Sequence, residues 1–407
     1  MIWFVGQGSR HYANYFAAHN LKYGLFTDKD RPVSAASSIP VIPVDFTSQE
    51  SILASLPRRP KDLDGVITIY ETYVYGAAVI TRHFGLPGMT PQAAKTCSDK
   101  ILMRQKFLDY QPAITPGFAS VQSWSDVLGF IRSHTFPFML KPANLTKSLL
   151  VTKNHNPQEL KQNYEFATKT IANLYQKHRV RQAPKLLIEE FLEGSVHSVD
   201  GFAGQGGVMR ILDQVIDYQT GYDIGKQENY HFSRRLPSRL PKTVQSGIRQ
   251  VAEQGMKALQ MQSSPAHVEV VVTKKGPKIV EIGARLGGYR PRMHSYANRI
   301  DLYQANINTA LGLKPDITAS ANKNCAVLEL FPDQEGLFTE ISNLEKLNHL
   351  PSIQYVSIKA KPYSRIGLSS QGYKASIIVM LGNEDSEQFE RDYAYVKDKV
   401  EVRTKEN

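Results

Sequence analysis

Short apolar runs alternate with stretches of helical spacing over the first hundred residues, and this alternation constrains the fold most strongly. Strands are predicted at 2–5, 21–27 and 64–70, and helices at 11–19 and 73–84. Strands that alternate with helices pair in parallel and are covered on both faces. The chain is therefore expected to begin with a parallel α/β unit. The turn Gly6-Gln7-Gly8 carries only part of a dinucleotide fingerprint, so a tight strand-to-helix turn is favoured over NAD binding.

The pattern becomes more mixed after Pro91. Ser98 or Asp99 is suited to cap a helix that has Lys100 in its first turn and apolar positions from Ile101 onward. Further strands are predicted at 136–140, 186–190, 197–203, 267–273, 278–282, 327–330, 353–361 and 375–381, and helices at 157–178 and 243–259. The segment 217–239 reads as a polar connection, and the last ninety residues as another α+β unit.

Two acidic residues interrupt the apolar strands at 267–273 and 278–282. Glu269 and Glu281 have apolar neighbours on both sides, and burying a lone carboxylate is costly. The turn Lys274-Lys275-Gly276-Pro277 joins the strands as a hairpin, so the two acids can face each other and share a divalent cation. The alternative is a pair of exposed acids on a sheet face.

Basic and glycine-rich segments surround this pair in the sequence. Arg285 follows Glu281 by four residues and precedes Leu286-Gly287-Gly288, where a guanidinium and open backbone suit an anionic ligand. Lys100, Lys141 and Lys147 are candidate phosphate contacts, although each alone is more typical of a solvated surface lysine. The segment 187–194 is an apolar strand that runs into two acids and an aromatic residue, which suits a nucleoside or an ordinary strand end.

Composition excludes several classes of protein. No apolar run approaches the roughly 18 residues of a membrane span, and the start of the chain does not resemble a signal peptide. Only Cys97 and Cys325 occur, which argues against a disulfide framework or a zinc finger. A net charge of +11 suits a polyanionic partner such as a nucleotide, and no basic–aromatic motif points to nucleic acid. We therefore expect a cytoplasmic protein without a nucleic-acid or membrane partner.

Taken in order, five motifs resemble those of the ATP-grasp superfamily of carboxylate–amine ligases. They are Ser98-Asp99-Lys100, Leu140-Lys141-Pro142, the segment 188–194, His267-Val268-Glu269, and the segment 281–288. Within that superfamily the chain is most similar to the L-amino-acid ligases. The stretch Glu71-Thr72-Tyr73-Val74 ahead of Gly85-Leu86-Pro87-Gly88 supports this, as does the segment 194–202.

The resemblance implies an α/β (α+β) ATP-grasp architecture over nearly the whole chain. Residues 1–97 would form the parallel-sheet domain that precedes the grasp, and residues 98–318 the two-lobed ATP-binding region with a mobile lid at about 135–195. Residues 319–407 would form the C-terminal α+β cap. ATP and Mg²⁺ (or Mn²⁺) are the implied cofactors, amino acids the implied substrates, and a homodimer is common in the resembled family.

The resemblance also assigns roles to individual residues. For the nucleotide it implies Lys100, Lys141, Lys147, Ser148, Glu189, Glu190, Phe191, Leu192 and His197, with 189–192 as the adenine hinge. Glu269 and Glu281 would ligate the metal, and Arg285 and Gly288 would meet an acyl phosphate. For the amino-acid substrates it implies Glu71, Arg285, Gly287, Gly288 and Tyr289, with Tyr289 limiting the acceptor pocket. His231 would contact the phosphorylated intermediate, and an exposed loop histidine is the alternative.

Two positions depart from the family pattern. The loop after Lys141, usually rich in glycine and serine, reads Ala143-Asn144-Leu145-Thr146-Lys147-Ser148. The position two residues after Glu281, often a metal-binding Asn, is Gly283. The metal would then rely on the two acids, phosphate oxygens and water.

The implied activity is amide-bond formation in two steps, in which ATP converts a carboxylate to an acyl phosphate and an amine displaces phosphate. Two alternatives remain open at this point. One is a different ATP-grasp enzyme, forming a nucleotide precursor or a carboxyphosphate. The other is a catalytically inactive nucleotide-binding regulatory protein, favoured by the altered loop and Gly283 but opposed by the intact Lys141, Glu269, Glu281 and Arg285.

Overall fold

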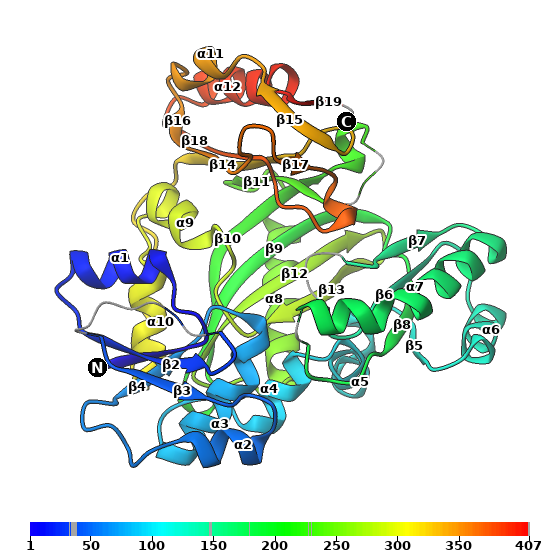
Figure 1. Cartoon of the computed structure of the whole chain (residues 1–407). Helices are drawn as coiled ribbons and strands as arrows, with labels where there is room; N and C mark the ends of the chain where they lie inside the picture. Colours follow the sequence, from blue (N-terminus) through cyan, green and yellow to red (C-terminus); the bar gives the residue numbers. More distant parts are fainter. Residues whose placement is uncertain are drawn as a thin grey trace.

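A computed structural model gives the fold of residues 1–31, 33, 39–145, 149–178, 180–226, 228 and 230–405. Lys147 and Ser148, two of the expected phosphate contacts, lie outside the described residues. Figure 1 shows the N-terminal domain, a lobe formed by β5–β8 and a C-terminal cap arranged around a long central sheet. Among the described residues, no helix is long and apolar enough to cross a bilayer.

The N-terminal domain contains the expected parallel sheet, in the strand order β3-β2-β1-β4. Its elements are β1 (Ile2–Val5), α1 (Arg10–Ala18), β2 (Tyr23–Asp28), β3 (Val41–Val44), α2 (Gln49–Ser55), β4 (Gly65–Ile67) and α3 (Val74–Phe84). The strand predicted at 64–70 ends earlier, at Ile67, where the Thr68 hydroxyl donates a hydrogen bond of 3.0 Å to the Val5 carbonyl. A short 3₁₀ turn, Glu71–Tyr73, follows and carries Glu71 at the end of the sheet.

Two short helices lead from this domain into the rest of the chain. They are α4 (Pro91–Cys97) and α5 (Lys100–Tyr110), and α5 is capped by Asp99, whose side chain accepts from the Ile101 and Leu102 N–H groups. This cap satisfies N–H groups that the first helical turn leaves without partners. It places Lys100 in the first turn of α5, as expected.

The central sheet has eight strands in the order β13-β12-β9-β10-β11-β14-β18-β16, and all its pairs are antiparallel. Its strands are β9 (Gly194–Ala203), β10 (Met209–Thr220), β11 (His231–Leu236), β12 (Ser264–Thr273), β13 (Gly276–Gly283), β14 (Asn324–Leu330), β16 (Ile353–Ile358) and β18 (Ile377–Asn383). Helix α8 (Lys242–Ala258) packs Ile248 and Met256 into the same core as Val268 and Ile279 of the sheet.

Reading 217–239 as a polar connection was wrong in part, because 217–220 belong to β10 and 231–236 form β11. The alternation of side chains along β10 explains the error. Ile216 and Tyr218 are buried, whereas Asp217 is only partly buried and pairs with His197 of the neighbouring strand β9. A strand that carries charged and aromatic side chains toward a site does not read as an apolar run.

The lobe on the right of Figure 1 is a four-stranded sheet in the order β5-β8-β6-β7. Its elements are β5 (Phe118–Val121), α6 (Trp124–Ser133), β6 (Phe138–Pro142), β7 (Thr152–Asn154), α7 (Pro157–His178) and β8 (Leu186–Glu190). The lobe, called the lid lobe below, thus starts at Phe118 rather than near residue 135. Arg181 after α7 forms an ion pair of 2.8 Å with Asp28 of β2, so the lid lobe also contacts the N-terminal domain.

The C-terminal region does not form a sheet of its own at the boundary expected near residue 319. Strands β14, β18 and β16 extend the central sheet, and only β15, β17 and β19 form a separate three-stranded sheet. The remaining elements are α9 (Arg290–Asn298), α10 (Leu302–Ala310), β15 (Gly336–Ile341), α11 (Leu344–Asn348), β17 (Arg365–Ile366), α12 (Ser386–Lys399) and β19 (Val402–Lys405). The cap is therefore continuous with the sheet that carries Glu269 and Glu281.

Candidate active site

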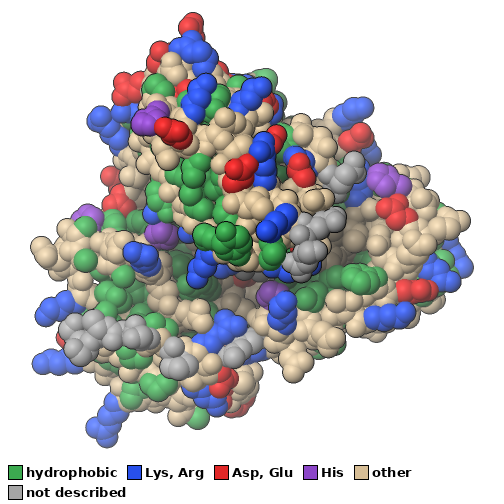
Figure 2. Space-filling model, turned by 45° about the horizontal axis from the view of Figure 1, so that its top comes forward, with side chains coloured by type: hydrophobic (Ala, Val, Ile, Leu, Met, Phe, Trp, Pro, Cys, Tyr) green, Lys and Arg blue, Asp and Glu red, His purple; other side chains and the backbone are tan. Residues whose placement is uncertain are grey.

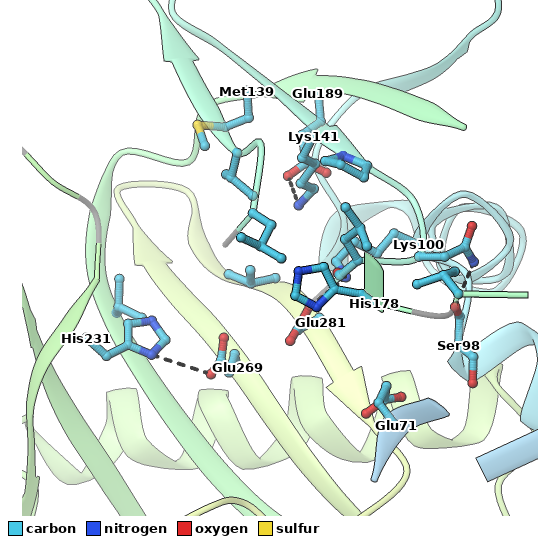
Figure 3. A pocket seen from close by; sticks show the side chains of 18 of the residues that line it. Glu71, Ser98, Lys100, Met139, Lys141, His178, Glu189, His231, Glu269 and Glu281 are labelled. Atoms are coloured by element: carbon cyan, nitrogen blue, oxygen red, sulfur yellow. Dashed lines mark hydrogen bonds and ion pairs between the residues drawn. The ribbon is translucent and has the colours of Figure 1, made fainter. Parts of the chain in front are cut away.

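A cleft of about 1370 Å³ lies where the lid lobe, the central sheet and the N-terminal domain meet. Each part contributes side chains: Glu71 from the N-terminal domain, Lys141 from the lid lobe, and Glu281 from the central sheet. Figure 2 shows a hollow between these parts of the molecule with basic side chains at its edge, and Figure 3 shows the cleft from close by.

Glu269 and Glu281 are directly opposite each other in the β12–β13 hairpin. The Lys100 ammonium lies 3.1 Å from the Glu281 carboxylate and lowers the pKa of Glu281. Burial opposes ionisation of Glu269, but the neighbouring His231 and His267 outweigh it and lower the pKa of this carboxyl. Both acids are therefore ionised at neutral pH, and both line the cleft.

Two ionised carboxylates that face each other suit a hard divalent cation such as Mg²⁺. Mg²⁺ takes few protein carboxylates and completes its shell with phosphate oxygens and water. Among the described residues, no cluster of three or more His, Cys, Asp or Glu side chains forms a complete metal site. The donor set of two carboxylates matches a metal that arrives with a nucleotide.

Lys141 and Glu189 form a buried pair at the lid side of the cleft, with 2.5 Å between Nζ and Oε1. Burial lowers the pKa of Lys141. Burial also opposes ionisation of Glu189, but Arg104 and Lys141 outweigh it and hold the pKa of Glu189 at about 2. Because Arg104 Nε contacts the second carboxylate oxygen at 3.0 Å, both Glu189 oxygens are already used inside the protein.

The other residues expected to hold the nucleotide differ in their surroundings. Phe191 and Leu192 line the cleft, and the Lys153 ammonium lies 3.9 Å from the centre of the Phe191 ring. The Glu190 carboxylate accepts a hydrogen bond of 2.7 Å from the Gly117 N–H. His197 is buried in β9, and its two ring nitrogens lie 2.9 Å from Asp217 and 2.7 Å from Ser195.

Glu71 and Arg285 meet at the end of β13, with 3.3 Å between Oε2 and Nε. Burial raises the pKa of Glu71, and the Arg285 guanidinium opposes this shift. Gly283 leaves the room that this pair occupies, because a Cβ there would lie 3.2 Å from Glu71 Oε2 and 3.3 Å from Arg285 Cζ. A larger side chain at this position would therefore require the Glu71–Arg285 pair to shift by a few tenths of an ångström.

The sequence resemblance implies that Glu71 and Arg285 bind an amino-acid substrate. Replacing Gly283 by Ala should then raise KM for that substrate about tenfold, because the added Cβ must shift the Glu71–Arg285 pair. KM for ATP should stay unchanged. Gly129→Ala is the matched control, since a Cβ at this exposed position of α6 meets nothing within 4 Å. Steady-state kinetics with each substrate varied in turn would measure the two KM values separately. An amino-acid KM that is equal in G283A and wild type would contradict the prediction.

His231 lines the cleft, whereas Tyr289, which was expected to limit the acceptor pocket, does not line it. His231 Nδ1 lies 3.8 Å from Glu269 Oε1, as Figure 3 shows, and burial lowers the pKa of His231. The Tyr289 hydroxyl donates to Glu329 of β14 at 2.6 Å, and Glu329 also pairs with Arg234 at 2.6 Å. This arrangement fixes the Tyr289 ring against the cap.

The two glycines after Leu286 serve different purposes. A Cβ on Gly287 would lie 2.5 Å from Arg290 and 2.8 Å from His267, so this glycine is required by internal packing. A Cβ on Gly288 would meet nothing within 4 Å, and Gly288 is exposed. Of the two, only Gly288 leaves open space for a ligand.

Sequence analysis did not identify the buried charged residues that contact these side chains. Arg104 bridges Glu189 and the carbonyls of Ile279 and Val280 at 2.8–3.0 Å. Asp200 and Arg290 are buried and pair with each other, and Asp200 also pairs with His267, which contacts Glu269. The sequence holds a weak signal for each residue: Arg104 stands one helical turn after Lys100, and Asp200 is a charged residue within an apolar strand. Nothing in a single sequence identifies their partners.

Comparison with known proteins bears on the fold of the chain. Residues 134–291 match the model of the ATP-grasp domain. A protein of Sinorhizobium fredii (strain NBRC 101917 / NGR234), described as uncharacterized protein y4rH, is 26% identical over 333 residues, or 81% of this chain. A D-alanine–D-alanine ligase of Acetivibrio thermocellus is 26% identical over 167 residues, or 40% of this chain. The matches span 66% and 41% of those two relatives.

Solved structures show the same fold over nearly the full chain. An L-amino acid ligase from Bacillus licheniformis matches with a TM-score of 0.77 at 18% identity, covering 99% of this chain and 98% of that one. An N5-carboxyaminoimidazole ribonucleotide synthetase from Thermotoga maritima matches with a TM-score of 0.70 at 15% identity, covering 99% of both chains. The protein has the ATP-grasp fold, and the superfamily resemblance found in the sequence is confirmed.

Proposed function

We propose that this ATP-grasp protein is an ATP-dependent ligase that joins the carboxylate of an amino acid, or a similar carboxylate, to an amine. The observation that carries the proposal is the Glu71–Arg285 pair, which lies in the same cleft as Glu269 and Glu281. A carboxylate and a guanidinium side by side suit the ammonium and carboxylate ends of an amino acid. The two opposed acids beside Lys100 suit a metal nucleotide.

The two ends of the substrate would bind to these groups by charge. Arg285 would hold the reacting carboxylate, and Glu71 would accept hydrogen bonds from the ammonium group. Both side chains are about one-fifth exposed, at 22% and 21%, so a ligand can reach them from the cleft. Binding would replace their contact with each other, and partial burial would strengthen each new charged contact.

Lys100 and Lys141 would meet the phosphate groups from opposite sides. Lys100 comes from α5 and Lys141 from β6 of the lid lobe. Lys141 is buried against Glu189, and Lys100 is partly buried and pairs with Glu281. A bound Mg²⁺ or Mn²⁺ would neutralise phosphate charge next to Glu269 and Glu281. The lysines would stabilise the charge that develops as the phosphoryl group moves.

The reaction would then proceed in two displacements. A substrate carboxylate oxygen forms a bond to the γ-phosphorus, and the bond to ADP breaks, which leaves an acyl phosphate. The nitrogen of a neutral amine then bonds to the acyl carbon, the carbon–oxygen bond breaks, phosphate leaves, and the amine loses one proton. The lid lobe would exclude water from the acyl phosphate, which would otherwise hydrolyse.

Phosphate release with pairs of amino acids, followed by mass spectrometry of the products, tests this proposal. The ligase requires phosphate release that depends on both a carboxylate and a second amine, and an amide product of the matching mass. Bicarbonate-dependent release would instead support a carboxyphosphate-forming enzyme. Phosphate release that no substrate pair stimulates, together with nucleotide binding, would support a regulatory protein.

A further inference from the structure

A buried charged cluster lies beside Glu269 on the same face of the central sheet, because the facing pair His267 and Asp200 is two residues along the strands from Glu269. Asp200 of β9 is its centre, and Asp200 and Arg290 each expose 2% of their surface. His267 and His294 complete the cluster and are also buried. Such a set of ionisable groups is expensive to desolvate, so stability alone does not account for it.

Two chains of side-chain contacts, called arms below, connect Asp200 to Glu269. In the first, His267 lies between the two carboxylates, with Nδ1 2.9 Å from Asp200 Oδ1 and Nε2 3.5 Å from Glu269 Oε1. The imidazole ring therefore spans the distance between the buried acid and the acid that faces the cleft. Its neighbour Gly287 has no side chain to displace the ring.

The second arm runs through Arg290 and Tyr218. Arg290 Nε lies 3.4 Å from Asp200 Oδ2, and an Arg290 amino group donates to the Tyr218 hydroxyl. The Tyr218 hydroxyl in turn donates to Glu269 Oε1 at 3.5 Å. Asp200 Oδ2 makes no hydrogen bond among the described residues and is held by charge, with His294 Nε2 also at 3.7 Å.

Both arms end at the same atom. His267, Tyr218 and, from the cap side, His231 all approach Glu269 Oε1, at 3.5, 3.5 and 3.8 Å. Three contacts from different directions restrain the rotation of a carboxylate about its last bond. With Oε1 engaged in these contacts, Oε2 is the oxygen left for a cation, and the register of the hairpin places Glu281 opposite Glu269.

We propose that Asp200 is a positioning residue that holds Glu269 through these two arms, so that Oε2 is presented to the metal of a metal nucleotide. Groups behind a metal ligand orient it, and their loss lowers metal affinity. This inference rests on the proposed function, because it requires that Glu269 meets a metal. It predicts a defect in metal binding rather than in nucleotide binding.

The test is Mn²⁺ binding, followed by electron paramagnetic resonance in the presence of the β,γ-imido analogue of ATP. Asp200→Asn should weaken Mn²⁺ binding roughly 10- to 100-fold, because the substitution removes the charge that holds His267 and Arg290. Binding of the analogue without metal should stay near wild type. The matched control is Asp392→Asn, since Asp392 is 3% exposed and lies in α12 of the cap.

Tyr218→Phe keeps the proposal testable if Asp200→Asn does not fold. It removes only the hydroxyl of the second arm and should also weaken Mn²⁺ binding, by a smaller factor. Unchanged Mn²⁺ affinity in Tyr218→Phe and in folded Asp200→Asn would overturn the inference, as would an equal loss in Asp392→Asn. A wild-type protein that binds no Mn²⁺ with the analogue would instead refute the proposed function.

Discussion

Replacing Glu281 by Gln should reduce turnover roughly 10³-fold or more, because the substitution removes one of the two carboxylates proposed to hold the metal nucleotide. Gln has nearly the same shape as Glu, so the packing of β13 should not change. Glu281 also pairs with Lys100 at 3.1 Å, and the loss of its charge would leave that ammonium without its nearest partner. Both effects change side chains that are proposed to lie next to the phosphate groups of ATP.

Glu253→Gln provides the control for Glu281→Gln. The Glu253 side chain on α8 is 44% exposed and pairs with Lys257 one helical turn away, so its loss should cost little stability and no activity. Phosphate release and far-ultraviolet circular dichroism should be measured on all three proteins. Retained turnover in folded E281Q would mean that the metal nucleotide binds elsewhere in the protein.

Replacing Arg104 by Met should lower the free energy of unfolding by about 3–5 kcal/mol, because it removes one partner from a buried charged pair. Arg104 is 1% exposed and donates to Glu189 and to the carbonyls of Ile279 and Val280. Met fills much of the same space but leaves these acceptors without a donor. Because Arg104 joins the lid lobe to β13, the loss should also loosen the lobe.

Chemical denaturation would measure the change, and Lys106→Met is the matched control on the exposed face of the same helix α5. The control should change the free energy of unfolding by less than about 0.5 kcal/mol. Equal stability of R104M and wild type would show that the Arg104 contacts contribute nothing net.

The pH dependence of the free energy of unfolding gives a second test of the Arg104–Glu189 pair. The folded protein holds the pKa of Glu189 at about 2, below its ordinary value of 4.5, so ionised Glu189 stabilises the fold above pH 4.5. That contribution is lost as pH falls from 4.5 toward 2 in the wild type. In R104M the pKa of Glu189 should rise toward 4.5, so the pH dependence over this range should shrink.

Much of the fold follows from local pattern. The alternation of apolar runs and helices predicted the parallel sheet, and the turn at Lys274 to Pro277 predicted the hairpin that brings Glu269 opposite Glu281. These features depend on spacing within a few residues. The helix at 157–178 and the strand at 186–190 also have the predicted bounds.

Features that depend on distant contacts were not predictable from one sequence. The cap strands β14, β18 and β16 were expected in a unit of their own, yet they pair onto the central sheet through β11, which was itself read as a connection. The partners of Arg104 and Asp200 lie 67 to 176 positions away along the chain. Spacing carries no information about such partners, so these supporting residues required a structure.

Transfer of an oxygen atom from the carboxylate to phosphate tests the proposed reaction most directly. The carboxylate substrate is labelled with ¹⁸O, and the inorganic phosphate released with the amide product is analysed by mass spectrometry. An acyl-phosphate intermediate requires that each phosphate carries one labelled oxygen, because the amine breaks the bond between carbon and the bridging oxygen. Unlabelled phosphate released together with product would contradict the account.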